Sequence, residues 1–283
     1  VASCESYGVD LLVSAIEESL APLGGMEAFV HPGQKVLLKP NFLSAKGPER
    51  AITTHPDMIE AVAGMVVRAG AVPLVGDSPG GAIRGIDRVW KNTGVLDMAR
   101  RAGIELVNFE ASGFEEVEWD GYRLFIARPA LEADLIINLP KLKTHTLTLL
   151  TCAVKNMFGV VPGFRKAEYH KSYPKPAEFA GMLVALYDRI RPALTIVDGV
   201  VSMEGNGPSS GSPKKTGLVM SGGDGVAVDT VAARMLGFRE GIIDTTRIAR
   251  ERGVGQADPA GIEVSGSGAG RFPEGFVLPS NRG

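Results

Sequence analysis

Lys35-Val-Leu-Leu-Lys-Pro-Asn41 and Val72-Pro-Leu-Val-Gly-Asp-Ser78 are two short apolar runs, and each run stops at a polar turn. Between them, Thr54-His-Pro56 predicts the start of a helix, because threonine caps helix N-termini and proline favours the first turn. We expect that helix to reach Arg68, since Gly70 then ends the apolar pattern. A strand, a helix and a second strand in this order predict two parallel strands with the helix covering their sheet.

The same alternation continues on both sides of this unit. Apolar spacing predicts helices at residues 9–23, 89–101, 177–190 and 226–236, and strands at residues 104–108, 134–138, 194–197, 217–220 and 262–265. Residues 115–119 and 122–126, divided by Asp120-Gly121, predict a β-hairpin. The sequence therefore predicts an α/β fold with a mostly parallel, Rossmann-like sheet, flanking helices and a hairpin.

The domain organisation has two readings. Residues 1–265 carry the alternating pattern, and one domain fits the length of 283 residues. The hairpin interrupts the pattern, so two α/β lobes that divide near residues 110–130 are the alternative. Residues 266–283 are rich in Gly, Pro and Ser and are expected to be a tail or linker.

The composition is typical of a globular protein. Hydrophobic residues make up 45% and charged residues 22% of the chain, so a large core can form without disulfides or metals. The net charge of −2 gives no general attraction to nucleic acid or anionic lipid. No apolar run approaches the roughly 18 residues of a membrane helix, so we expect no membrane partner. Two cysteines, Cys4 and Cys152, build no disulfide framework, which favours the reducing cytoplasm.

Polar residues follow five of the predicted strands. In open parallel sheets, ligands bind outside the carboxyl ends of the strands, so these positions are candidates for a site. They are Lys39-Pro-Asn41, Gly76-Asp-Ser78, Asn138-Leu-Pro-Lys141, Asp198-Gly199 and Ser221-Gly-Gly-Asp224. Turns are polar in any fold, so the sequence leaves open whether these positions form one site.

The densest of these segments is Asn138-Leu-Pro-Lys-Leu-Lys-Thr-His145, which carries Lys141, Lys143 and His145 directly after a buried strand. Apolar spacing then predicts a helix from about His145 to Gly159. Basic residues beside a helix N-terminus favour an anion such as a carboxylate or a phosphate. The alternative is a solvated basic turn.

Three further segments carry candidates for chemistry. Lys155, on the predicted helix, is either a partly buried base or nucleophile, or a charge that stabilises the helix C-terminus. His170, in a predicted charged loop, is an acid, a base, a metal ligand or a surface histidine. Asp198 and Glu204, in a predicted polar loop, either bind a cation or a substrate hydroxyl, or belong to a plain flexible loop.

Together these motifs resemble the domain of unknown function 362 family, a group of uncharacterised and often anaerobic microbial proteins. The resemblance extends from Glu5 to about Gly237, and the matching stretches are Val36–Asn41, Thr54–Pro56, Gly76–Ser78, Asn138–His145, Val154–Gly159, Val197–Gly199, Glu204–Pro208 and Gly223–Asp229. The resemblance implies no established reaction.

Many members of that family carry a C-terminal ferredoxin-like module with two four-iron clusters. The sequence up to Gly283 has no such run of cysteines. Either that module is absent or the chain was cut before it. In the second case the resemblance implies an iron–sulfur cluster in a longer protein and not in this chain, with a ferredoxin-like domain or protein as the partner.

A second, more distant pattern joins His145, Lys155, Val161-Pro-Gly163 and His170, and it is similar to that of nickel-pincer lactate racemases. This resemblance implies that Lys155 would hold a cofactor, and that His145 and His170 would be nickel ligands or acid–base groups. The glycine-rich run before the racemase lysine is replaced here by Leu149-Leu-Thr-Cys-Ala-Val154. The resemblance thus favours a shared fold with altered chemistry.

The leading hypothesis is an enzyme that acts on a small anionic molecule, with His145, Lys155 and His170 as catalytic groups. The residues expected to bind the substrate are Lys39, Asn41, Asp77, Ser78, Lys141, Lys143, Asn156, Asp198 and Glu204. The candidate metal ligands are His145, His170 and Asp198. Two alternatives are open: a redox partner domain that works with iron–sulfur clusters outside this chain, and a non-catalytic binder of a metabolite or metal.

Overall fold

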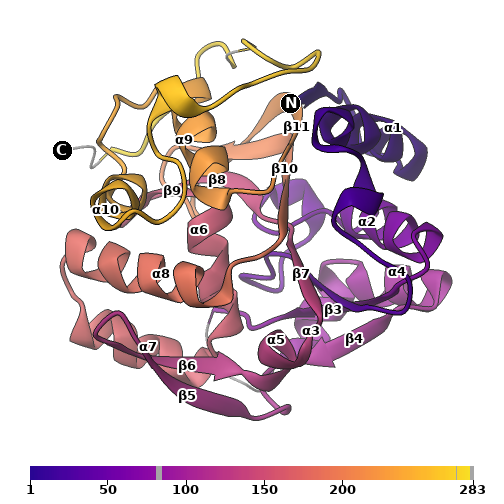
Figure 1. Ribbon diagram of the computed structural model, residues 1–283, viewed down its shortest axis with the longest axis horizontal. Helices are drawn as coiled ribbons and strands as arrows, with labels where there is room; N and C mark the ends of the chain where they lie inside the picture. The colour runs from indigo at the N-terminus through magenta and orange to yellow at the C-terminus, as the bar shows by residue number, and fades with distance from the viewer. Residues whose placement is uncertain (81–84, 272, 281–283) are drawn as a thin grey trace.

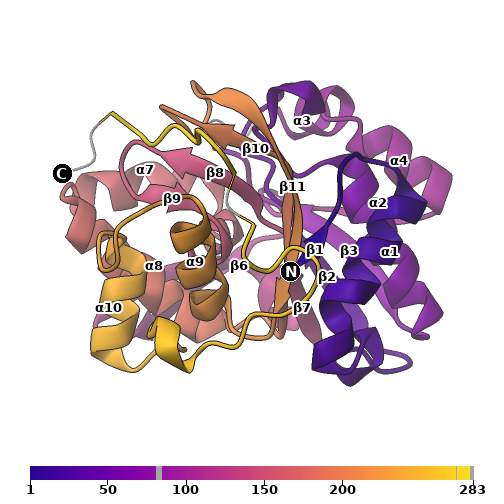
Figure 2. The ribbon, with the colours of Figure 1, turned by 90° about the horizontal axis from the view of Figure 1, so that it is seen from above.

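The computed structural model describes residues 1–80, 85–271 and 273–280 of the chain. Within these ranges, one large sheet has the strand order β1-β11-β10-β7-β2-β3-β4, with β8 beside β10 and β9 beside β8 (Figure 1). Helices cover both faces of this sheet, which Figure 2 shows edge-on between them. The predicted α/β fold is therefore confirmed.

Four parallel strands form the centre of the sheet, in the order β7 (Leu135–Asn138), β2 (Lys35–Lys39), β3 (Val72–Asp77) and β4 (Glu105–Asn108). The register places Lys39 opposite Asn138, so β2 and β7 end at the same level. Because the strands run in one direction, the residues that follow them meet at one edge of the sheet.

β10 (Leu194–Glu204) joins this parallel centre to the antiparallel edge. Its first residues pair in parallel with β7, and its later residues pair in parallel with β8 (Lys141–His145). β7 and β8 thus follow each other along β10, with a break at Leu139-Pro140. On its other side β10 pairs antiparallel with β11 (Ser212–Gly222), and β1 (Ala2–Ser3) completes the edge.

The helices form two layers, which are distinct in Figure 2. The layer on one face of the sheet contains the helices from the first part of the chain, which are α1 (Val9–Leu20), α2 (Pro56–Arg68), α3 (Ile86–Asn92) and α4 (Val95–Ala102). The opposite layer contains α6 (Ala153–Asn156), α7 (Gly163–Ser172), α8 (Pro176–Ile190), α9 (Gly225–Met235) and α10 (Asp244–Arg252). The short helix α5 (Arg128–Glu132) directly precedes β7. The chain also forms short 3₁₀ helices, which are η1 (Ala21–Leu23), η2 (Met26–Ala28), η3 (Pro48–Arg50), η4 (Met157–Val160) and η5 (Pro259–Gly261).

The residues of β2 show why this strand is apolar throughout. Val36 and Leu38 belong to the core beneath α1 and α2, whereas Leu37 belongs to the core that contains α8 residues. Successive side chains of a strand point to opposite faces. Since both faces are covered by helices, each side chain in the middle of β2 must be apolar.

The helix predicted from His145 to Gly159 is wrong. His145 instead ends β8, β9 (Leu149–Thr151) pairs back on β8, and a one-turn helix starts only at Ala153. The pairing of β8 with β10 joins residues far apart in sequence, and such a pairing overrides apolar residues at helical spacing. Leu149 also has a φ of 62°, which lies outside the right-handed helical region.

Two further expectations about helices are corrected. His170 lies on α7 and not in a loop, because Tyr169 and Lys166 are buried and give this charged segment an inner face. Residues 89–101 do not form one helix: α3 and α4 are separated at Gly94, whose φ of 78° ends helical geometry.

Two expectations about strands are corrected as well. Asp198 and Gly199 lie inside β10 and not in a loop after it, because the pairing with β8 and β11 continues. The strand predicted at residues 262–265 is absent from this fully described segment. Residues 262–265 are connected to the start of the chain by isolated hydrogen bonds, such as that from the Val1 amino group to the Ser265 carbonyl (2.7 Å). These bonds do not form the regular pairing of a β-strand.

The predicted hairpin is confirmed as a separate antiparallel sheet of β5 (Phe114–Trp119) and β6 (Tyr122–Ala127). It occupies the region of the expected boundary at residues 110–130, while β2 and β7, which precede and follow it in the chain, pair in one sheet.

The described part of the tail packs near the end of β10, where the Val277 N–H donates to the Glu204 carboxylate (2.9 Å). Residues 272 and 281–283 of the tail lie outside the described residues. In the described ranges, no helix combines the length and apolarity that spanning a bilayer requires.

Two neighbouring leucines on α1 test this core. Leu12 is fully buried, whereas Leu11 is 56% exposed. We expect Leu12→Ala to lower the free energy of unfolding by about 2–5 kcal/mol, because a cavity replaces packed methyl groups. Leu11→Ala should change it by less than about 0.5 kcal/mol. Urea unfolding followed by circular dichroism measures both, and equal losses would contradict the assigned faces of α1.

Candidate functional site

A cavity of about 400 Å³ lies at the carboxyl edge of the parallel strands. It is bounded by residues that follow β2 and β3, by the β8–β9 pair, and by α6, η4 and α7. Its lining residues in the described ranges are Lys39, Asn41, Leu43, Asp77, Ser78, Gly80, Lys143, His145, Thr151, Lys155, Asn156, Phe158, Gly159, Gly163, Lys166, Ala167, His170 and Pro208. The cavity therefore gathers four lysines, two histidines and one carboxylate.

A buried ion pair lies at the end of β2 and β3. The Lys39 Nζ is 2.7 Å from Oδ1 of Asp77, and it also donates to the Pro40 carbonyl (2.8 Å). Burial lowers the pKa of Lys39, and the Asp77 carboxylate opposes that shift. Gly159 faces the pair so closely that a Cβ there would overlap Asp77 Oδ1. A glycine is therefore required for η4 to approach the strand ends.

Three asparagines tie the strand ends to α6. Asn156 Nδ2 donates to Asn138 Oδ1 (2.8 Å) and to the Lys39 carbonyl (3.2 Å), and its Oδ1 accepts from Asn41 Nδ2 (2.9 Å). Asn138 Nδ2 in turn donates to the Ala153 carbonyl (3.0 Å). Buried amides with all partners present rigidify their surroundings, so this network fixes the position of α6 against the sheet.

Lys143 has no carboxylate partner in the described part of the chain. Its Nζ donates to Asn41 Oδ1 (3.0 Å) and to the Ile52 carbonyl (2.6 Å), and the side chain is fully buried. Burial, together with the charges of Lys155 and Lys141, lowers the pKa of Lys143 well below its usual range.

Lys155, on α6, is the least satisfied of the four lysines. Its Nζ lies 4.9 Å from the Phe158 ring centroid and 5.5 Å from the Phe179 ring centroid, and among the described residues it has no hydrogen-bond acceptor or carboxylate. Burial and then the charges of Lys166 and Lys39 lower the pKa of Lys155 to about 7. The amine is therefore partly neutral at neutral pH.

Lys166 and Glu110 belong to the site but were missed in the sequence, because both lie in charged segments that are typical of surfaces. Lys166 Nζ donates to the carbonyls of Ser78 and Pro79, and burial lowers its pKa to about 8. Ser78 donates through its hydroxyl to Glu110, which also accepts from Gly163 N (2.8 Å). These contacts hold α7 over the end of β3.

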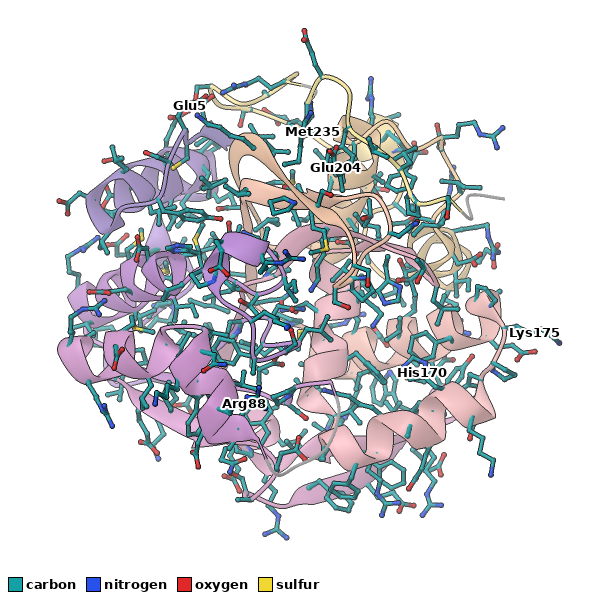
Figure 3. All side chains as sticks on the ribbon, turned by 180° about the vertical axis from the view of Figure 1, so that it is seen from behind. Glu5, Arg88, His170, Lys175, Glu204 and Met235 are labelled. Atoms are coloured by element: carbon teal, nitrogen blue, oxygen red, sulfur yellow. The ribbon has the colours of Figure 1, made fainter. Side chains whose placement is uncertain are left out.

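The two histidines that line the cavity differ in their exposure and in their contacts. His145 Nδ1 accepts the N–H groups of Leu147 (2.9 Å) and Thr148 (3.3 Å), so the proton of the neutral ring is on Nε2. Burial, followed by the charges of Lys155 and Lys143, lowers the pKa of His145 to about 2. His170 is exposed on α7 (Figure 3) and stacks on Phe179 at 4.6 Å between ring centroids. Burial of part of its ring lowers its pKa.

Lys141 and Asp198 do not line the cavity. Lys141 Nζ is 2.9 Å from Asp198 Oδ2 and also donates to the Tyr7 hydroxyl (2.6 Å). Asp198 accepts from that hydroxyl (2.8 Å) and from the His55 backbone N–H (2.9 Å), and the His55 ring stacks on Tyr7. Lys141 and Asp198 are thus buried and paired with each other, and the half-buried Tyr7 and His55 complete this cluster outside the lining of the cavity.

Glu204 lies apart from the cavity too, at the end of β10, and Figure 3 shows it separated from His170. In the described residues, no group of three or more His, Cys, Asp or Glu side chains could hold a metal ion. The candidate ligands His145, His170 and Asp198 therefore do not converge, and only the two histidines share the cavity.

Asp229 ends the family-matching stretch Gly223–Asp229, but the sequence did not mark it as a site residue. Its carboxylate accepts the N–H groups of Ala153 (2.5 Å) and Val154 (3.0 Å) at the start of α6, and burial raises its pKa to about 7. Asp229 on α9 thus fixes the helical turn that carries Lys155. Its place in a Val-Ala-Val-Asp run was the only sequence signal.

The Lys141–Asp198 pair gives a stability prediction. We expect Lys141→Met to lower the free energy of unfolding by about 3–5 kcal/mol, because it leaves Asp198 buried and unpaired. Adding Asp198→Asn should recover a large part of this loss, since the uncompensated charge is removed. Chemical denaturation of the single and double variants measures both, and a double variant no more stable than Lys141→Met would contradict the role of the pair.

The low pKa of Lys155 gives a pH prediction. Its pKa falls from 10.5 to about 7 in the folded chain, so the unfolded chain binds more protons between these values. Folding is therefore penalised fully below pH 7, and the penalty disappears as pH rises to 10.5. The stability gained by Lys155→Met should be largest below pH 7 and decline above it. Lys171→Met, at an exposed position of α7, is the control, and a pH-independent gain for Lys155→Met would contradict the shift.

Residues 36–234 match the family model described as "Domain of unknown function (DUF362)". The "Thylakoid-associated protein sll1697" of Synechocystis sp. is 40% identical over 250 residues, which are 88% of this chain and 77% of that protein.

A solved structure shares the fold at low sequence identity. The lactate racemase apoprotein from Thermoanaerobacterium thermosaccharolyticum matches with a TM-score of 0.51 and 15% identity, over 78% of this chain and 53% of that chain. The chain thus spans about half the length of the racemase, and the likeness concerns the fold alone. From the match over residues 36–234 and the 40% identical relative, the chain belongs to the domain of unknown function 362 family.

Proposed function

We propose that this chain is an enzyme that binds a small carboxylate- or phosphate-bearing molecule in the lysine-rich cavity and moves a proton to or from it. The observation that carries this proposal is the amine of Lys155, which lines the cavity without a polar partner in the described ranges, beside three other lysines. Cationic groups gathered in a concave site are the complement of an anionic ligand.

The excess of positive charge supports an anionic ligand. Lys39, Lys143, Lys155 and Lys166 line the cavity with Asp77 as the carboxylate among the described lining residues. Burial lowers the pKa values of these lysines, and the charges of neighbouring lysines add to the shift for Lys143, Lys155 and Lys166. A bound anion removes part of this repulsion, so the ligand and the protonated lysines stabilise each other.

The hydrogen bonds of the lysines indicate how they would hold the ligand. An ammonium group has three donors, and Lys143 and Lys166 each use two of them on protein oxygens. Each therefore keeps one donor for a ligand oxygen. These lysines are positioned by their protein partners before the ligand binds, which lowers the cost of ordering them.

Lys155 and His145 support proton transfer. A base works best when its pKa lies near the working pH, and the pKa of Lys155 is about 7. The neutral ring of His145 presents an Nε2–H that would donate a hydrogen bond to a substrate oxygen, because Nδ1 is occupied by backbone N–H groups. His170, at the exposed side of the cavity, would exchange protons with solvent.

The structural neighbour supports a carboxylate as the ligand. As its name states, that racemase acts on lactate, which is a hydroxy acid, and the shared fold would place a ligand at the same edge of the sheet. A non-catalytic binder would need the same cavity, so binding alone does not separate the two functions, and proton exchange does.

Titration calorimetry with malonate, lactate, pyruvate and phosphate tests binding. We expect at least one of these anions to bind, and we expect Lys143→Met and Lys166→Met each to weaken it by about tenfold or more, because a charged hydrogen bond contributes about 1.5–3 kcal/mol. Lys171→Met, which removes an exposed charge from the same helix as Lys166, should leave the affinity unchanged.

Exchange of carbon-bound hydrogen with D₂O, followed by proton NMR, tests proton transfer on whichever of malonate, lactate and pyruvate binds. We expect exchange to be faster with the wild type than with Lys155→Met. Binding without exchange would instead support the non-catalytic binder. If no anion bound, or if Lys143→Met and Lys171→Met behaved alike, the cavity would not be an anion site.

A further inference from the structure

The surroundings of Lys155 differ from those of the other three cavity lysines. Lys39 faces Asp77, whereas Lys143 and Lys166 donate to protein oxygens. Lys155 Nζ lies instead over the Phe158 and Phe179 rings, at 4.9 and 5.5 Å from their centroids. With no acceptor among the described residues, this amine has its nitrogen lone pair available whenever it is neutral.

Two features keep part of this amine neutral. Burial removes part of the water that would stabilise an ammonium group. Lys166 and Lys39, which retain partners for their own charge, add repulsion. A lysine that is desolvated and placed next to other cations is an activated nucleophile toward carbonyl carbon.

We propose that Lys155 forms a Schiff base with a 2-oxo acid, whose carboxylate is held by the adjacent lysines Lys143 and Lys166. The inference rests on the proposed anion site and names its substrate class. A carboxylate next to a carbonyl suits this cavity, because the cationic donors and the nucleophilic amine line one space of about 400 Å³.

The chemistry balances with groups that the chain and water supply. The Lys155 nitrogen lone pair forms a bond to the carbonyl carbon, and the C=O π electrons move to oxygen, which takes up a proton. Nitrogen releases one proton to give the carbinolamine. The hydroxyl of the carbinolamine then takes up a proton and leaves as water, while the nitrogen lone pair forms the C=N bond of a protonated imine, which keeps one hydrogen on nitrogen. No oxidant, reductant or metal takes part.

His145 and His170 have separate positions for these proton movements. The Nε2–H of His145 would donate a hydrogen bond to the carbonyl oxygen of the substrate while Lys155 attacks the carbonyl carbon. The low pKa of His145 keeps its ring neutral, so Nε2–H is its donor. His170 is an exposed residue of α7 and lines the same cavity, so it would carry protons between the carbinolamine and solvent.

Reductive trapping tests the proposal on the full chain. The protein is incubated with pyruvate at neutral pH, reduced with borohydride and weighed by intact mass spectrometry, followed by peptide mapping. We expect a stable adduct equal to pyruvic acid less one oxygen atom, located on Lys155. Lactate, which has the carboxylate but no carbonyl, should give none. Lys155→Arg, which keeps a charge, should abolish the adduct, and Lys171→Met should retain it.

The outcomes separate this inference from the anion site. Pyruvate that binds in calorimetry but leaves no adduct would overturn the Schiff base and leave the anion site standing. An adduct on other lysines only, or a group already attached to Lys155 in the untreated protein, would also overturn it. Mapping of the wild-type adduct decides the result even if Lys155→Arg does not fold. Absence of all anion binding would instead contradict the proposed function.

Discussion

Burial of lysine ammonium groups at one edge of the sheet is the constraint on which the rest of the structure depends. An ammonium group inside a protein needs a countercharge or several oxygen acceptors. Lys39 and Lys141 have carboxylates at 2.7 and 2.9 Å. Lys143 has an amide and a carbonyl oxygen instead. These partners follow or belong to three strands, β2, β3 and β10, so the lysines and the strands fix one another.

The backbone around the cavity is shaped to allow this burial. β7 and β8 are interrupted at Leu139-Pro140, so two strands pair with successive parts of β10. Gly159 permits η4 to lie against the Lys39–Asp77 pair. Asp229 and the asparagine network then hold α6 in place. Lys155 is thus carried by a turn that is fixed from both sides, while its own amine has no polar partner in the described ranges.

The cavity is rich in cations and yet disfavours their full charge. Burial and mutual repulsion lower the pKa values of Lys143, Lys155 and Lys166. An anion that entered the cavity would reverse part of this shift, so the proposed anion binding would be coupled to lysine protonation. The fold shared with a lactate racemase at 15% identity supplies the sheet edge, whereas the proposed chemistry depends on these side chains.

Local patterns in the sequence determined the α/β class, the parallel centre and the hairpin, because apolar periodicity and turn residues act over a few neighbouring positions. The same patterns identified Lys39, Asp77 and Lys143 at strand ends. The tertiary structure alone decided that residues 141–145 and 149–151 form strands and that Lys141 and Asp198 lie in a separate buried cluster. It also brought Lys166 and Glu110 to the site. Those outcomes depend on pairing and packing between residues far apart in the chain, which no local pattern records.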